Sequence, residues 1–302
     1  MHIPDGFLSP PVWLSLDVVS VLALGYVARR AQRGMEETRI PLLGVMGAFV
    51  FAAQMINFPV GVGTSGHLVG AALLAITLGP AAAAVVMTAI LAIQALVFQD
   101  GGILALGANV MNMALAGVLA GYLPYHYWSA GRLRKPAIVL GGLLSVAAGA
   151  GLAVAELLLS GVRMPAAVLG VSAALFLLTG VLEGLITLAV VQGVEALNPG
   201  MIRQPSRTRA AVLGALALAA VLLAVGGVLA ASQAPDVLES LAERLGIAPQ
   251  ARALLATPLA DYEAQVFSSP WLRKAAAGLV GLGLIYGACV ALGRLAARRK
   301  RG

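Results

Sequence analysis

Charged residues are scarce in this 302-residue chain, and their scarcity excludes an ordinary soluble domain. They make up 11% of the sequence, whereas 60% of it is hydrophobic. Soluble globular proteins carry about 25% charged residues. Apolar runs of roughly twenty residues recur along the chain, which is the length that a helix needs to cross a bilayer. The composition therefore predicts an all-α fold, a polytopic bundle of membrane helices in the plasma or inner membrane.

Cysteine and histidine are equally scarce. Cys289 is the only cysteine, which excludes an intrachain disulfide, and its apolar neighbours favour a small packing residue. The three histidines are His2, His67 and His126. The sequence contains neither a HExxH helix nor a GxxxxGK phosphate loop. We therefore expect no enzyme activity and no permanent cofactor.

About nine apolar segments are indicated. The third is too short to cross a bilayer alone, and because it ends at Gly79-Pro80 we expect a broken or tilted element there. The other segments have the length expected of full spans. The nine segments lie near 11–28, 41–57, 67–79, 80–98, 103–123, 136–157, 166–192, 210–232 and 275–297.

The basic residues predict the orientation of the bundle, because short loops rich in Lys and Arg stay in the cytoplasm. With the amino terminus outside, 15 of the 20 basic residues lie on the inner side. These are Arg29, Arg30, Arg33, Arg39, Arg132, Arg134, Lys135, Arg203, Arg207, Arg209, Arg294, Arg298, Arg299, Lys300 and Arg301. The net charge of +7 thus reflects membrane topology, and we expect no nucleic-acid partner.

A basic, proline-containing linker near 198–209 divides the chain. Residues 1–200 contain seven of the apolar segments and all three histidines, and we expect them to form a metal-binding membrane unit. Residues 209–302 contain two spans joined by an acid-rich segment, 233–274. We expect this second part to be an appended two-span companion unit with an extracytoplasmic loop.

The first two residues form a candidate metal chelator. The amine of Met1, the amide nitrogen of His2 and the His2 Nδ1 atom can close a five-membered and a six-membered ring on one ion. Nitrogen-rich, square-planar sites are typical of Cu(II) and Ni(II). The alternative is an accidental histidine on a frayed terminus. Phe7 and Trp13 lie among prolines and glycine here, which favours an ordered turn, and without a basic n-region we expect Met1 to be retained.

His67 is the candidate fourth donor. It lies in a glycine-rich stretch at the outer end of the third segment, so the predicted orientation places it on the same side as His2. Thr64 and Ser65 could bond the imidazole or a bridging water. The alternative for His67 is a helix-cap residue at the membrane interface. His126 is predicted on the inner side among aromatic residues, where an interfacial role is favoured over metal binding.

Several polar residues are expected inside the spans. Asn109 and Asn112 lie three apart, so they share one helix face and could support the metal or the amino terminus, or simply join helices, as Gln54 and Gln94 could. Glu183 marks a candidate partner contact, an ion path or a structural node. Glu156 is expected to extend toward the outer interface.

Four stretches together resemble a known family. MHIPDGFL at the amino terminus, GTSGHLVGAALLAITLGP at 63–80, ALGANVMNMALAG at 105–117 and GVLEGLITLAVV at 180–191 are similar to the cobalt/nickel substrate-binding membrane subunit of energy-coupling-factor transporters, the CbiM/NikM family. TPLADYEAQVF in the outer loop resembles the small companion subunit of these systems, here fused. The resemblance covers about residues 1–200 and, less specifically, the carboxy-terminal part.

The resemblance implies a function and partners. It implies that Met1, His2 and His67 hold Ni²⁺ or Co²⁺, and that a transmembrane coupling subunit and cytoplasmic ATPases complete an uptake transporter. A stand-alone secondary carrier or channel is the alternative, and it would need polar residues through several spans. Nitrogen ligation leans toward Ni²⁺, but metal supply can outweigh the order of affinities.

Overall fold

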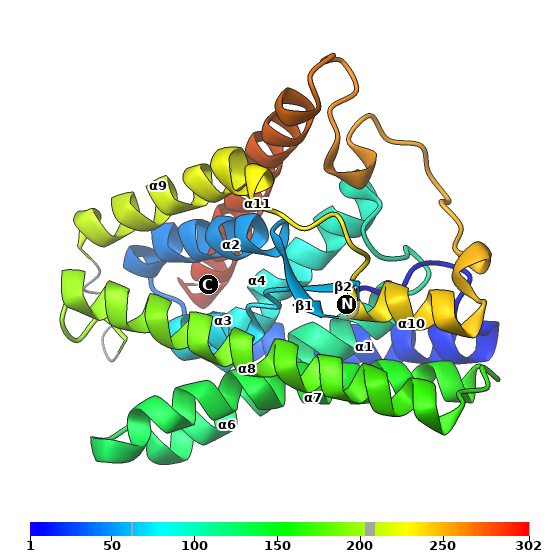
Figure 1. Cartoon of the computed structure of the whole chain (residues 1–302). Helices are drawn as coiled ribbons and strands as arrows, with labels where there is room; N and C mark the ends of the chain where they lie inside the picture. Colours follow the sequence, from blue (N-terminus) through cyan, green and yellow to red (C-terminus); the bar gives the residue numbers. More distant parts are fainter. Residues whose placement is uncertain (62, 203–208, 302) are drawn as a thin grey trace.

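A computed structural model describes residues 1–61, 63–202 and 209–301, and the side chains within those ranges up to residue 298. The fold is a helical membrane bundle, as the composition predicts (Figure 1). The main helices are α1 (Pro10–Gly34), α2 (Ile40–Gln54), α3 (Ala71–Leu78), α4 (Pro80–Ile93), α5 (Leu106–Asn109), α6 (Val118–Trp128), α7 (Arg134–Leu159), α8 (Ala166–Leu197), α9 (Ala210–Gly226), α10 (Val237–Leu245) and α11 (Pro270–Arg301). A hairpin of β1 (Asn57–Gly61) and β2 (Thr64–His67) joins α2 to α3.

Seven helical stretches of the described chain are long and apolar enough to cross a membrane. Two of them contain a π-helical turn: α4 continues into Gln94–Phe98, and Val110–Gly117 joins α5 to α6. The seven stretches are Pro10–Gly34, Pro80–Phe98, Leu106–Trp128, Gly131–Leu159, Ala166–Leu197, Ala210–Leu229 and Pro270–Arg298. The sequence predicted about nine segments, so the count is slightly too high.

The difference lies in α2 and α3. The segment 41–57 was predicted as a full span, but α2 has 15 residues and measures about 22 Å at 1.5 Å per residue, short of the roughly 30 Å of a bilayer core. Its residues are apolar because protein surrounds them, with nearly all of α2 buried. The break predicted at Gly79-Pro80 is present, because α3 ends at Leu78 and α4 begins at Pro80.

Two groups of helices enclose the β1–β2 hairpin. Helices α9 and α11 pack against α2, whereas α6, α7 and α8 pack against α3 (Figure 1). Close approach of α11 to α2 requires small residues, since a Cβ atom at Gly47 would lie 2.9 Å from the Cys289 sulfur. Cys289 is buried, which confirms its predicted packing role. The hairpin therefore lies between the two parts of the chain that the linker separates.

The two ends of the bundle differ in their contacts. At one end the amino-terminal segment meets the long outer loop through a bridge between Asp5 and Arg252. At the other end Arg39 donates to the carbonyl of Leu78 at 2.8 Å. The amino terminus and the acid-rich loop thus share one end, the arrangement that the charge bias requires if that end faces outward.

Candidate metal site

The amino-terminal segment is ordered by side chains placed further along the chain. The Asp5 carboxylate accepts hydrogen bonds from the amides of Ile103 and Leu104 at 2.9 and 2.8 Å. The Asn109 side chain accepts a hydrogen bond from the Ile3 amide at 2.8 Å and donates one to the Ile3 carbonyl at 3.0 Å. These bonds fix the backbone on both sides of Ile3. The structure therefore shows an ordered turn in place of a frayed terminus, and Asn109 supports the amino terminus as one of its predicted roles requires.

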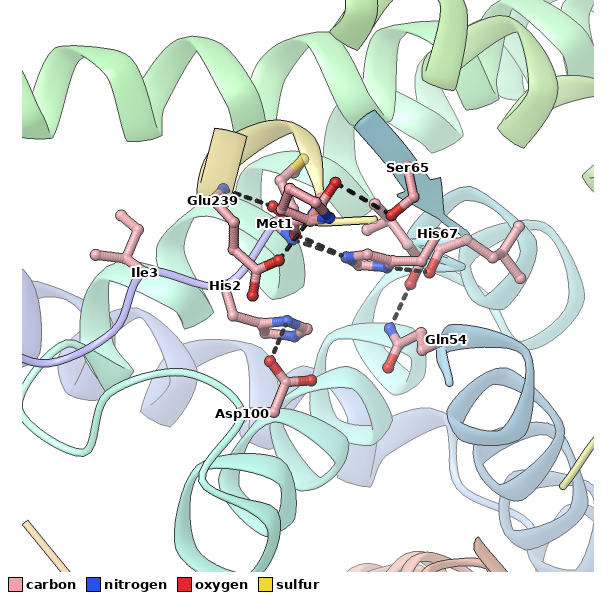
Figure 2. Close-up of polar contacts among 12 residues, drawn as sticks. Met1, His2, Ile3, Gln54, Ser65, His67, Asp100 and Glu239 are labelled. Carbon is pink, nitrogen blue, oxygen red and sulfur yellow. Dashed lines mark hydrogen bonds and ion pairs between the residues drawn. The ribbon is translucent and has the colours of Figure 1, made fainter. Parts of the chain in front are cut away.

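The Met1 side chain anchors the terminal amine. Met1 is buried, and it fills a notch in α7, where a Cβ atom at Gly149 would lie 2.7 Å from the Met1 methyl carbon. The amine then lies 2.7 Å from the Nε2 atom of His67 (Figure 2). Two of the predicted nitrogen donors, separated by 66 residues in sequence, are therefore in direct contact.

His67 presents its Nε2 atom toward the amine because its other ring nitrogen is occupied. Nδ1 lies 3.0 Å from the carbonyl oxygen of Leu68, and donation to that carbonyl leaves the lone pair on Nε2. The next two amides, of Val69 and Gly70, donate to the Glu183 carboxylate at 2.7 and 2.8 Å. Gly70 has a left-handed φ of 78°, so this turn requires glycine. Glu183 thereby fixes the chain that follows His67.

This arrangement changes the interpretation of Glu183. Its side chain is fully buried in α8, and both of its oxygens bind backbone amides of the same chain. The predicted partner contact stays a prediction. Glu183 is the structural node that the sequence left open as an alternative.

The His2 imidazole lies beside that of His67. The two rings are nearly parallel, with an angle of 5° and a centroid separation of 5.6 Å. His2 Nδ1 lies 3.0 Å from an Asp100 oxygen, and the side chain is only 5% exposed. Its Nε2 atom has no hydrogen-bond partner in the described chain. The Nδ1 atom that the sequence assigned to chelation is therefore held by Asp100, and the ring must turn before it can chelate.

The companion unit contributes a carboxylate that sequence reasoning missed. Asp236 is the N-cap of α10, where one of its oxygens accepts from the Glu239 amide at 2.8 Å. The other oxygen forms an ion pair with the Met1 amine and lies 3.5 Å from His67 Nε2. The Ser65 amide donates to the Pro235 carbonyl at 2.8 Å, which attaches this segment to β2. The capping-box pattern of Asp236 and Glu239 was a readable signal for α10, but not for its position.

Comparison with known proteins identifies the family. The family described as cobalt uptake substrate-specific transmembrane region matches residues 2–201. The chain belongs to this cobalt-uptake family. A protein of Archaeoglobus fulgidus named "Putative fused nickel transport protein NikMN" is 37% identical over 98% of this chain and 99% of its own length. The fused nickel transport protein NikMN of Rhodobacter capsulatus is 37% identical over 52% of this chain and 45% of its own length.

Solved structures agree with the family. A crystal structure of a transition metal transporter aligns with a TM-score of 0.57 and 33% identity, covering 65% of this chain and 93% of that one. A truncated transition metal transporter aligns with a TM-score of 0.56 and 34% identity, covering 65% of this chain and 98% of that one. The chain is thus a multi-pass membrane protein of the cobalt-uptake family, in the fused form that the resemblance predicts.

The remaining residues that the sequence predicted to support the metal make hydrogen bonds to other parts of the chain. Thr64 and Ser65 contact the companion unit, since the Thr64 hydroxyl lies 3.0 Å from that of Ser240 and the Ser65 hydroxyl donates to the Ala234 carbonyl at 2.7 Å. Asn112 donates to Glu156 at 2.9 Å. The predicted extension of Glu156 to the outer interface is wrong, because its side chain is buried against the π-helical turn Val110–Gly117.

The electrostatics of the family member keep the imidazole of His67 neutral and the carboxylates ionised. Burial, followed by the adjacent amino-terminal charge, lowers the pKa of His67. Burial alone would raise the pKa of Asp236, but the amino-terminal charge and His67 hold it below its ordinary range. Burial likewise opposes ionisation of Asp100, and His2 holds the pKa of Asp100 low. Neutral nitrogen beside anionic oxygen is the state in which such groups bind a cation.

Proposed function

We propose that the chain is the substrate-specific membrane subunit of an energy-coupling-factor uptake transporter, and that it captures Ni²⁺ or Co²⁺ at Met1, His2 and His67. The observation that carries the proposal is the 2.7 Å approach of the Met1 amine to His67 Nε2 beside a buried second imidazole. Relatives named for nickel or cobalt transport support the choice of substrate.

The proposed ligands are the Met1 amine, the amide nitrogen and Nδ1 of His2, and Nε2 of His67. Metal binding would release one proton from the Met1 ammonium group and one from the His2 amide to solvent. The amine would lose its contact to Asp236, and His2 would exchange its Asp100 contact for the ion. Four nitrogen donors favour late first-row ions over Mg²⁺ or Ca²⁺. Four nitrogen donors would also bind Cu²⁺ well in vitro, so selection of Ni²⁺ or Co²⁺ over Cu²⁺ depends in part on which metal the cell supplies. Amide ligation and the full-length relative's name both favour Ni²⁺.

The transport step would need other subunits. The sequence contains no GxxxxGK motif, so ATP hydrolysis falls to cytoplasmic ATPases acting through a transmembrane coupling subunit. The alternative of a stand-alone carrier needs a polar path through the spans. The two buried span carboxylates of the described chain, Glu156 and Glu183, instead bind groups of the same chain. This use of both carboxylates favours the subunit over the carrier.

The terminal amine is tested by blocking it. An amino-terminal tag that is not cleaved removes the free amine of Met1 and displaces it from His67, so both metal content of the purified protein and uptake in cells should be lost. A tag at the carboxy terminus is the control. A permanently tagged protein that binds and transports like the untagged one would remove the amine from the site. Uptake that persists without partner ATPases would favour the carrier.

A further inference from the structure

A cavity of about 740 Å³ lies against the candidate metal site, between the two units of the chain. The first unit lines it with His2, His67 and Asp100. The companion unit lines it from the segment that precedes α10, from α10 itself and from the outer loop. Figure 2 shows Glu239 of α10 directed toward the same space as Met1 and His2. The cavity therefore borders the proposed nitrogen donors.

The cavity lining carries a strong excess of negative charge. Five carboxylates line it, and Lys274 is the one basic side chain among its described lining residues. Only Asp100 comes from the first unit. The four carboxylates of the companion unit are those of Asp236, Glu239, Glu243 and Asp261. Like charges gathered on low-dielectric walls raise the local concentration of counter-ions.

The carboxylates differ in how far their charge is compensated. Next to the proposed ligands, Asp236 forms an ion pair with the Met1 amine, and Asp100 accepts a hydrogen bond from His2 Nδ1. Glu243 and Asp261 are exposed, and neither forms an ion pair within the described ranges. The charge that is free to attract a cation is thus on the companion unit, further from the nitrogen donors.

A second, independent feature points to a ligand that enters from this cavity. The His2 side chain is 95% buried, judged from its 5% exposure, and it lines the cavity. Its Nε2 atom has no hydrogen-bond partner in the part of the chain that the structure describes. Because Nδ1 faces a carboxylate, the proton belongs on Nδ1 and a lone pair remains on Nε2. A buried, unpaired lone pair needs an explanation, and a cation in the cavity supplies one.

We propose that this cavity is an outer antechamber, in which carboxylates of the companion unit attract hydrated divalent cations and pass them to the nitrogen donors. The inference rests on the proposed function and adds a role for the companion unit. Oxygen ligands suit hydrated ions with little selectivity, whereas nitrogen donors select late first-row metals. Capture and selection are then separate steps, and the companion unit acts on the rate of capture.

The test is a matched pair of double variants of the full chain in detergent. Glu243→Gln with Asp261→Asn neutralises the two uncompensated carboxylates. Asn tolerates the left-handed φ of 53° at Asp261, and both side chains are exposed, so the fold is retained. Glu36→Gln with Glu37→Gln, two exposed residues between α1 and α2, is the control. It makes the same change of net charge at two residues that do not line the cavity.

The measurement is the association rate of Ni²⁺, followed by stopped flow against a metal-sensitive dye. At about 0.01 M salt, where the Debye length is roughly 30 Å, the Glu243/Asp261 variant should bind roughly tenfold more slowly than the native chain. The difference should disappear at about 1 M salt, where the Debye length is roughly 3 Å. The dissociation rate should stay unchanged, and the control should bind at the native rate.

Two results would overturn the antechamber. One is an unchanged association rate in the Glu243/Asp261 variant, and the other is an equal loss in both double variants, which would reflect overall charge alone. Neither affects the proposed nitrogen site, which fails on a different result. If the native chain does not retain Ni²⁺ or Co²⁺, or if blocking the Met1 amine leaves binding unchanged, the proposed function fails and the antechamber fails with it.

Discussion

The first unit and the companion unit contribute to the site in opposite ways. The first unit supplies nitrogen donors, and it fixes them with its own side chains: Asn109 and Asp5 hold the amino terminus, and Glu183 holds the turn after His67. The companion unit supplies oxygen, through Asp236 at the start of a short helix. In the proposed site all four ligands therefore come from the first unit, and the companion unit contributes negative charge beside them.

The largest effect should follow from removing a nitrogen donor of the first unit. His67→Ala should abolish metal accumulation, because loss even of a residue that supports a ligand costs about 10- to 100-fold in affinity. His126→Ala is the control, since His126 is exposed among Tyr122 and Tyr127 in α6. Metal content and uptake, measured on equal amounts of inserted protein, decide the outcome. Equal losses in the two variants would mean that His67 has no special role.

Changing the spacing of the first unit's donors should separate binding from transport. One Ala inserted between Met1 and His2 moves the histidine to the third position, which gives a four-nitrogen chelate that needs no second histidine. The extra residue also breaks the fit of Met1 against Gly149. The variant should hold Cu²⁺ or Ni²⁺ but transport little. Uptake at the native rate would show that the ion need not contact His67.

Removing the support beneath His67 should have an intermediate effect. Glu183→Ala leaves the amides of Val69 and Gly70 without acceptors, and each hydrogen bond to a charged group contributes about 1.5–3 kcal/mol. A lower melting temperature and weaker Ni²⁺ binding should appear together, because one carboxylate stabilises both the bundle and the turn. Glu195→Ala, which breaks a half-buried pair with Arg134, is the control for stability. If the Glu183→Ala protein keeps its melting temperature and its Ni²⁺ affinity and loses only uptake, Glu183 is a partner contact.

The difference between the units also explains what the sequence could predict. His2 and His67 could be assigned to one end because the basic residues predict the orientation of the chain, and both lie in stretches that carry the family resemblance. Asp100 and Asp236 could not. Asp100 reaches His2 only through the path of the loop after Gln94–Phe98, and Asp236 reaches His67 only through the packing of α10. The short α2 was misjudged for a similar reason. A helix buried in protein and one buried in lipid have the same apolar composition, and only the packing of α9 and α11 on α2 separates the two cases.

The smallest effect should come from the companion unit's carboxylate. Asp236→Asn keeps an N-cap for α10 and removes only the charge that faces the Met1 amine. A carboxylate attracts a divalent ion more strongly than the single charge of an ammonium group, so Ni²⁺ affinity should fall, by about 1 kcal/mol or less. Isothermal titration calorimetry measures this affinity. The control is Ser240→Ala, a neighbouring change that leaves Asp236 intact. Tighter binding by Asp236→Asn would show that the carboxylate competes with the metal by holding the amine in its protonated form, and the companion unit would then restrain the site it adjoins.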